Sequence, residues 1–354
     1  MSEFTRAWAQ PMPAPVSALA LTPEGNLAVG FRSEVEGVVA REYARTDKGL
    51  DKRRDLVRGL KEIATQSLSS FTQLKVHEGN LYFGAYGKLM RLAPGKTDQA
   101  QVAFDPGWGR QFDAFGFAPN GDLYLAAHYI GASRGVNLYR CVKTLEGWAA
   151  PEYLNGGKSL SGEAWYIAPS DLEVDAQGRV VLRLNNPEKI DNGREITICR
   201  WSPDGSREKV FSVGADFEQY GSYGLHLASD GKLYVAGGTS RSVSCLAPTG
   251  ELLWRSGYEV HQGPNSVPWR QPMGITTDRR GRVWITEPAR NQVICLAPDG
   301  KFLKAYGHFG SIDGRDGMAF CNPAGIAAIK DAAGVEWLYV ADAGNQRLVK
   351  WRLP

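Results

Sequence analysis

Short apolar runs alternate with polar turns along the whole chain. One template recurs seven times: an apolar run, a turn closed by glycine, and a second apolar run. Its copies are residues 19–31, 74–85, 115–127, 172–184, 225–237, 275–287 and 326–342. Their turn glycines, spaced by 42 to 57 residues, are Gly25, Gly79, Gly121, Gly178, Gly231, Gly281 and Gly334. A repeat of this length made of short apolar runs predicts a series of similar β units.

Each repeat also predicts two further strands. Third strands begin at Lys88, Ile196, Ser242 and Gln292 and lead into turns with proline and glycine, after which a fourth strand follows. Four strands per period indicate an all-β fold, a β-propeller of four-stranded antiparallel blades in one domain, residues 1–354. We count seven blades, with six as the alternative. The last repeat lacks a fourth strand, so we expect residues 4–10 to complete that blade as an N-terminal strand and close the ring.

The last third of the chain carries a more specific pattern. Residues 310–329 and 338–351 contain a polar loop, a Pro-x-Gly-Ile start and the strand pair Tyr-Val-x-Asp-x-x-Asn-x-Arg. Residues 272–307 are a second copy, with Glu287 at the aspartate position and Val293 at the arginine position. These stretches resemble the NHL-repeat β-propeller family. The resemblance implies that Asp342, Asn345 and Arg347 brace a blade.

Composition narrows the choice of partners. The chain has 41 Lys and Arg against 38 Asp and Glu, a formal charge of +3, which is too balanced to favour nucleic acid or an anionic membrane. The first residues contain no apolar signal-peptide core, and no apolar run is long enough to span a bilayer. We therefore expect a soluble, cytoplasmic monomer. The Lys- and Arg-rich residues 47–61 favour a charged outer edge over a patch for an acidic partner.

The five cysteines show no disulfide framework. Cys245 and Cys295 lie in near-identical segments, and Cys141 and Cys199 lie on the corresponding strand of other repeats. Equivalent positions of different blades should be too far apart for a disulfide. We expect these four to be buried thiols, and Cys321 to lie in a loop.

Arginine and aromatic residues gather at one predicted face. Trp108 and Trp269 each come shortly before a first strand, and an arginine follows each of them, Arg110 and Arg270. The loops expected on this face are long, and long loops on a rigid scaffold usually carry binding. Trp, Tyr and Arg are enriched at binding hot spots, and Arg suits carboxylate or phosphate groups. We expect Tyr129, Arg134 and Arg290 in the same layer, and the predicted ligand-binding residues are Trp108, Arg110, His128, Asp171, Tyr223, Arg241, His261, Trp269, Arg270 and Glu287.

Catalysis is the alternative. The resemblance extends distantly to amidating-lyase-like propellers, which use histidines around zinc, to gluconolactonase-like propellers, which use carboxylates around calcium, and to virginiamycin-lyase-like propellers, which use a histidine with Mg²⁺. His128, His261 and His308 are expected on one face, but no histidine pair has local metal-ligand spacing. Asp171, at the start of an inner strand, has no accompanying carboxylates at the matching positions. We therefore predict a non-catalytic binding propeller without a cofactor, recognising a protein segment or a polar or anionic ligand. A metal-dependent lyase or hydrolase with Ca²⁺ or Zn²⁺ is the alternative.

Overall fold

The structure is a computed structural model. It describes residues 5–12, 16–21, 27–35, 38–46, 49–58, 74–78, 80–85, 87–92, 101–108, 112–128, 136–154, 169–184, 197–212, 224–237, 241–257, 269–310, 319–330, 334–342, 344–345 and 347–353. Strands dominate these residues, and their helical element is one short 3-10 turn, η1 (Pro288–Arg290). The prediction of an all-β chain is therefore confirmed. No helix in this part of the chain is long and apolar enough to cross a membrane.

The chain divides into two compact units. The first unit contains Met1–Phe83, Arg91–Gln101 and Ser256–Pro354, and the second contains Gly84–Met90 and Val102–Arg255. We describe each unit by itself. The expectation of one domain over residues 1–354 stays a prediction.

In the first unit, three sheets have four strands each, and every neighbouring pair of strands is antiparallel. The strand orders are β2 (Val16–Leu21)-β3 (Leu27–Val35)-β4 (Val38–Thr46)-β5 (Gly49–Arg58), then β24 (Ile275–Thr277)-β25 (Val283–Glu287)-β26 (Gln292–Leu296)-β27 (Phe302–Tyr306), and β1 (Thr5–Pro11)-β32 (Arg347–Arg352)-β31 (Glu336–Asp342)-β30 (Pro323–Lys330). A short parallel pair joins β28 (His308–Phe309) to β29 (Ala319–Phe320). The N-terminal strand β1 pairs with β32 near the other end of the sequence, with Arg6 opposite Trp351 and Ala9 opposite Val349.

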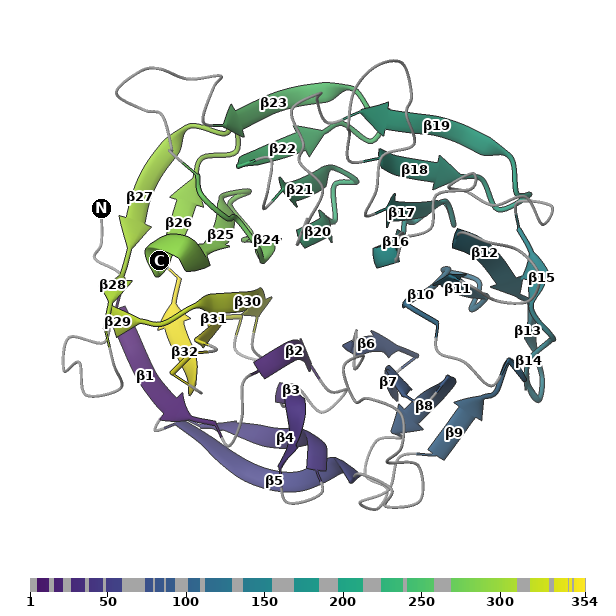
Figure 1. Ribbon diagram of the computed structural model, residues 1–354, viewed down its shortest axis with the longest axis horizontal. Coiled ribbons are helices and arrows are strands. Elements are labelled where there is room, and N and C mark those ends of the chain that lie inside the picture. The colour runs from purple at the N-terminus through teal and green to yellow at the C-terminus, as the bar shows by residue number, and fades with distance from the viewer. Residues whose placement is uncertain are drawn as a thin grey trace. The chain divides into compact units, whose positions relative to one another are not determined.

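Three further sheets of four strands belong to the second unit and follow one another in sequence (Figure 1). They are β10 (Ala114–Phe117)-β11 (Leu123–His128)-β12 (Val136–Cys141)-β15 (Glu152–Tyr153), then β16 (Pro169–Val174)-β17 (Val180–Leu184)-β18 (Thr197–Trp201)-β19 (Arg207–Ser212), and β20 (Gly224–Leu227)-β21 (Leu233–Gly237)-β22 (Ser242–Leu246)-β23 (Leu252–Gly257). A two-stranded hairpin, β13 (Lys143–Thr144) and β14 (Gly147–Trp148), lies between β12 and β15. The remaining sheet has the order β6 (Leu74–His77)-β7 (Asn80–Ala85)-β8 (Lys88–Leu92)-β9 (Gln101–Phe104).

The turns between first and second strands form as the sequence predicts. The turn glycines Gly121, Gly178, Gly231, Gly281 and Gly334 have φ between 72° and 87°. At Gly281, for example, a left-handed φ of 72° is needed for the turn that joins β24 to β25. Asp278 fixes the same turn, because its carboxylate accepts the backbone N–H groups of Arg280 and Arg282 and the Nε of Arg282. Gly25 and Gly79 lie outside the described residues.

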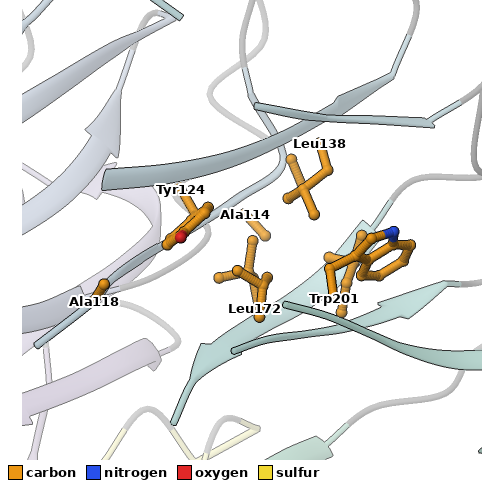
Figure 2. Packing of buried hydrophobic residues seen from close by; sticks show 9 residues of the cluster. Ala114, Ala118, Tyr124, Leu138, Leu172 and Trp201 are labelled. Atoms are coloured by element: carbon orange, nitrogen blue, oxygen red, sulfur yellow. The ribbon is translucent and has the colours of Figure 1, made fainter. Parts of the chain in front are cut away.

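The core of each unit lies between successive sheets. In the second unit, Leu172 of β16 packs with Ala114, Tyr124, Leu138 and Trp201, all of them buried (Figure 2). The sheets approach closely because Gly116 of β10 faces β16, where a Cβ atom would come within 2.6 Å of Leu172 Cδ2. This interdigitation of apolar side chains from neighbouring sheets is the core that the repeat predicts.

Guanidinium groups join neighbouring sheets of the second unit. Arg140 on β12 donates to Asp122 Oδ2 of its own sheet at 2.6 Å and to the carbonyl oxygen of Pro203, in the next sheet, at 2.9 Å. Arg200 on β18 repeats the arrangement, donating to Glu208 Oε2 at 2.6 Å and to the carbonyl of Pro248 in the sheet after that. These paired contacts fix each sheet against the next.

Cysteine burial follows the prediction for the described residues. Cys141, Cys245 and Cys295 are buried and unpaired, and Cys321 is a partly exposed free thiol between β29 and β30. The side chain of Cys199 lies outside the described part of the chain.

The charged segment over residues 47–61 is partly described. It contributes most of the edge strand β5, and its register places Asp55 opposite Arg41 and Arg54 opposite Glu42. The position of β5 at the end of its sheet agrees with the expected edge strand.

Candidate functional site

The ten predicted ligand-binding residues fall into two groups. Trp108, Arg241, Trp269, Arg270 and Glu287 have described side chains. Arg110, Tyr223 and His261 lie outside the described residues, and for His128 on β11 and Asp171 on β16 only the backbone is described. Tyr129, Arg134, the loop over 311–318 and most of the long loops are likewise not described. The geometry of the candidate site is therefore built from the first unit, around Glu287.

Glu287 at the end of β25 is fully buried, and its carboxylate accepts hydrogen bonds from the backbone of the first unit. Its Oε1 accepts the backbone N–H of Gln271 at 2.7 Å, and its Oε2 accepts that of Arg270 at 3.1 Å. The backbone N–H of Ala289 in η1 also donates to this carboxylate. Burial raises the pKa of Glu287 above its usual value, although these amides and the charge of Arg290 oppose the shift. The carboxylate of Glu287 ties the segment before β24 to the turn after β25; that Glu287 contacts a ligand stays a prediction.

Trp269 is a fully buried residue of the first unit; its predicted contact with a ligand stays a prediction. Its side chain has no exposed surface, and its indole Nε1 donates to Ser256 Oγ at 3.1 Å. A large apolar ring at this position fills space inside the first unit. Phe320 occupies the equivalent position of the next sheet and is also fully buried. The Trp-Arg pattern thus consists of a buried tryptophan, Trp269, followed by an exposed arginine, Arg270.

Arg270, by contrast, is exposed. The Glu287 carboxylate holds its backbone, while among the described residues no carboxylate oxygen forms an ion pair with its guanidinium. Arg290, one turn after β25, is half-buried; it interacts electrostatically with Glu287, yet it too has no ion pair with the described part of the chain. Arg241 is exposed in the turn before β22 with φ of 50°. Exposed guanidinium groups without an internal carboxylate are suited to contact an external anion.

The equivalent end of β31 shows what such a position becomes when its charges are satisfied. Asp342 accepts the N–H of Cys321 at 2.7 Å, Asn345 Nδ2 at 2.8 Å and Arg347 Nε at 2.7 Å. Arg347 is almost fully buried and also donates to the carbonyl of Ala319. These residues brace the sheet, in agreement with the structural role that the resemblance implies.

The strand register corrects one assignment. Arg347 pairs with Asp342, and the residue that pairs with Glu287 in the same way is Gln292, not Val293. Gln292 donates its side-chain amide to the carbonyl of Gly307 at 3.2 Å, where Arg347 donates to Ala319. The sequence alignment was displaced by one residue, because the turns after β25 and β31 differ in their local conformation.

In the second unit, Trp108 belongs to an aromatic stack that the sequence did not reveal. Its ring lies 4.4 Å from that of Tyr139, and Tyr139 lies 4.7 Å from Tyr153. Tyr139 is buried, while 45% of Tyr153 is exposed. Tyr139 and Tyr153 are on the paired strands β12 and β15. This pairing, which the sequence did not reveal, brings the two tyrosines together.

The described histidines do not form a metal centre. No group of three or more His, Cys, Asp or Glu side chains among the described residues could hold a metal ion. His308 is exposed on β28, but its expected companions His128 and His261 are not described. His226 on β20 is another matter: its ring lies 6.3 Å from that of Tyr234, and Glu173 and Asp230 act on it electrostatically. It is a partly buried imidazole of the second unit and was not among the predicted site residues.

Comparisons with known proteins agree with this architecture. No family model matches the sequence, and no curated protein matches it. Among solved structures, virginiamycin B lyase from Staphylococcus aureus, in its selenomethionine form, is 14% identical with a TM-score of 0.64, over 99% of this chain and 100% of that chain. A catalytically inactive variant of the same enzyme with quinupristin gives 14% and 0.62, over 99% and 100%. The extracellular domain of a protein assigned as a hybrid two-component system from B. thetaiotaomicron is 15% identical with a TM-score of 0.59, over 96% of this chain and 39% of that chain. At such identities the likeness shows the fold alone: the chain has a β-propeller fold.

Proposed function

We propose that this β-propeller is a non-catalytic binding protein that recognises a protein segment or a polar, anionic ligand on the face that carries its long loops. In this proposal the four-stranded sheets are seven blades of one ring, with β1 completing the last blade. The protein acts as a cytoplasmic monomer, needs no cofactor, and binds neither nucleic acid nor membranes.

The observation that carries the proposal is Arg270. A buried tryptophan and a buried carboxylate on either side of it, Trp269 and Glu287, fix its backbone, while its guanidinium remains exposed. In this arrangement, contacts inside the protein hold the backbone of one exposed charged residue in place. A charged hydrogen bond from a preorganised guanidinium is worth about 1.5–3 kcal/mol to a ligand.

The proposal is tested by binding of inorganic phosphate and of a dicarboxylate to the purified protein at low ionic strength. Calorimetry should detect binding to the wild type, and Arg270→Ala should weaken it by about 1.5–3 kcal/mol without changing the melting temperature. Arg280→Ala is the matched control, because Arg280 is equally exposed but lies at the opposite end of the β24–β25 hairpin. An anion that binds the wild type and the Arg270 variant equally well would contradict the proposal.

Catalysis by a metal-dependent lyase is a second candidate, suggested by the activity of an enzyme among the solved structures that share the fold. Two of them are forms of virginiamycin B lyase, one with quinupristin. The test is incubation of the protein with quinupristin and Mg²⁺, Zn²⁺ or Ca²⁺, followed by mass spectrometry, together with elemental analysis of the purified protein. Metal-dependent conversion of quinupristin would replace the binding proposal; unchanged quinupristin under all three metals would remove this candidate substrate.

A further inference from the structure

The arginine that follows the second strand occupies different places in two equivalent sheets. After β31 the chain reads Asp342-Ala-Gly-Asn-Gln-Arg347. The guanidinium of Arg347 donates hydrogen bonds to Asp342 and to the carbonyl of Ala319 inside the protein. After β25 the chain reads Glu287-Pro-Ala-Arg290-Asn-Gln, so the arginine comes two residues earlier. Because of this change, a glutamine fills the internal position and the guanidinium of Arg290 is left outside the buried hydrogen-bond network.

The conformation of the turn after β25 accounts for the different position of the arginine. Pro288, Ala289 and Arg290 form the 3-10 turn η1, and Asn291 takes a left-handed conformation with φ of 56°. The Asn291 side chain then accepts the backbone N–H of Asn322 at 2.8 Å, which ties the turn to the start of the neighbouring sheet. Arg290 therefore stands on a turn that is fixed at both ends.

Glu287 links this turn to the segment that carries Arg270. Its carboxylate accepts the N–H groups of Arg270 and Gln271 on one side and that of Ala289 on the other. The two arginines are thus attached through their backbones to one buried carboxylate. Neither guanidinium forms an ion pair with a described carboxylate, although the residues stand at the same end of the β24–β25 hairpin.

We propose that Arg270 and Arg290 act together as a clamp for one anionic group, a carboxylate or a phosphate, and that Glu287 is the positioning residue that sets their spacing. The inference rests on the proposed binding function and deepens it, because it names the second charged contact and the chemistry of the group bound. Two guanidinium groups provide planar, paired N–H donors for oxyanions, and their fixed backbones leave only the side chains to be ordered on binding.

The experiment measures dissociation constants for inorganic phosphate and for succinate in the wild type and in Arg270→Ala, Arg290→Ala, Arg290→Lys and Arg280→Ala. We expect each alanine variant at 270 and 290 to lose affinity about tenfold or more. Arg290→Lys should bind with intermediate affinity, since the charge remains but the paired donors are lost. Arg280→Ala should bind like the wild type. The two ligands show whether the site prefers phosphate or carboxylate.

The outcomes separate this inference from the function on which it rests. If neither anion binds the wild type, the anion-binding function itself fails. If Arg270→Ala weakens binding but Arg290→Ala does not, the function stands and the clamp is wrong. If both alanine variants lose affinity together with several degrees of melting temperature, the arginines are structural and the clamp is again wrong.

The role of Glu287 has its own readout. Glu287→Gln removes a negative charge near both arginines, so a purely electrostatic role predicts tighter phosphate binding in the variant. A positioning role predicts weaker binding, because the glutamine amide cannot accept three backbone N–H groups. Tighter binding by Glu287→Gln would overturn the positioning role, whatever the variant's stability.

Discussion

The buried cysteines show how the surroundings of one residue set its chemistry. Loss of solvation by burial raises the pKa of Cys141 to about 12, of Cys245 to about 11 and of Cys295 to about 12. Almost no thiolate exists at neutral pH under these conditions, and the thiolate is the nucleophile. These cysteines therefore contribute as small apolar residues and not as reactive groups.

This leads to a prediction on labelling. In native protein at neutral pH, iodoacetamide should modify Cys321 and leave Cys141, Cys245 and Cys295 unmodified, whereas all four should react after denaturation. Peptide mass mapping measures the difference. Equal labelling of the four in native protein, or an intact mass that reveals paired cysteines, would refute the burial that the structure shows.

His226 is the residue of the second unit with the clearest pH consequence. Burial lowers its pKa below that of the unfolded chain, although Glu173 and Asp230 act in the opposite direction. As pH falls through about 6.5, the unfolded state binds a proton that the folded state resists, so stability should decrease. One such proton changes the free energy of unfolding by at most about 1.4 kcal/mol per pH unit. Urea denaturation of wild type and His226→Gln between neutral and mildly acidic pH measures it.

The variant should show a shallower loss of stability than the wild type over this range. His308→Gln, at an exposed position of β28, is the matched His-to-Gln substitution with which the slope of the His226 variant is compared. Identical slopes in all three proteins would mean that His226 titrates normally in the folded state.

At the scale of elements, the hairpin turn between the first and second strands carries the repeat. Gly281 requires a left-handed φ of 72°, and a Cβ there would also approach Pro298 Cγ at 3.4 Å. We expect Gly281→Ala to lower the free energy of unfolding by about 1–2 kcal/mol. Gly325→Ala is the matched control, because a Cβ would meet only Ala341 at an ordinary 3.6 Å. Equal stabilities of the two variants by urea denaturation would contradict the strain at the turn.

Turns and strands were predictable because their signals are local. A left-handed glycine such as Gly281 and the apolar runs beside it report the hairpin within about a dozen residues of sequence. Register was harder to predict: a slip of one residue was enough to assign Val293 instead of Gln292 to the position of Arg347. The side chain of Arg270 is exposed. The sequence could not show that Trp269 and Glu287 beside it are buried, since that depends on contacts with Ser256, Gln271 and Ala289.

At the scale of the whole molecule, the pairing of β1 with β32 adds the fourth strand to the sheet formed by β30, β31 and β32. β32 is hydrogen-bonded to β31 on one side and to β1 on the other, so removing β1 leaves one edge of β32 unpaired. Deletion of residues 1–10 should therefore cause a large loss of melting temperature or aggregation. Deletion of residues 1–4, which precede β1, is the control. An unchanged melting temperature and a monomeric elution profile for the longer deletion would show that this pairing contributes little.

The same pairing has a consequence for protein synthesis. β1 leaves the ribosome before its partner β32, which is translated only after every strand of the second unit. The second unit can pair its strands with near neighbours as they emerge, whereas the nascent β1 must wait with its hydrogen-bonding groups unmatched. Contacts between residues so distant in sequence slow folding and prolong the exposure of unpaired strand edges, which are prone to aggregate. The first unit is therefore completed only after the second unit has been translated, and the nascent β1 is the segment that a chaperone would be expected to protect.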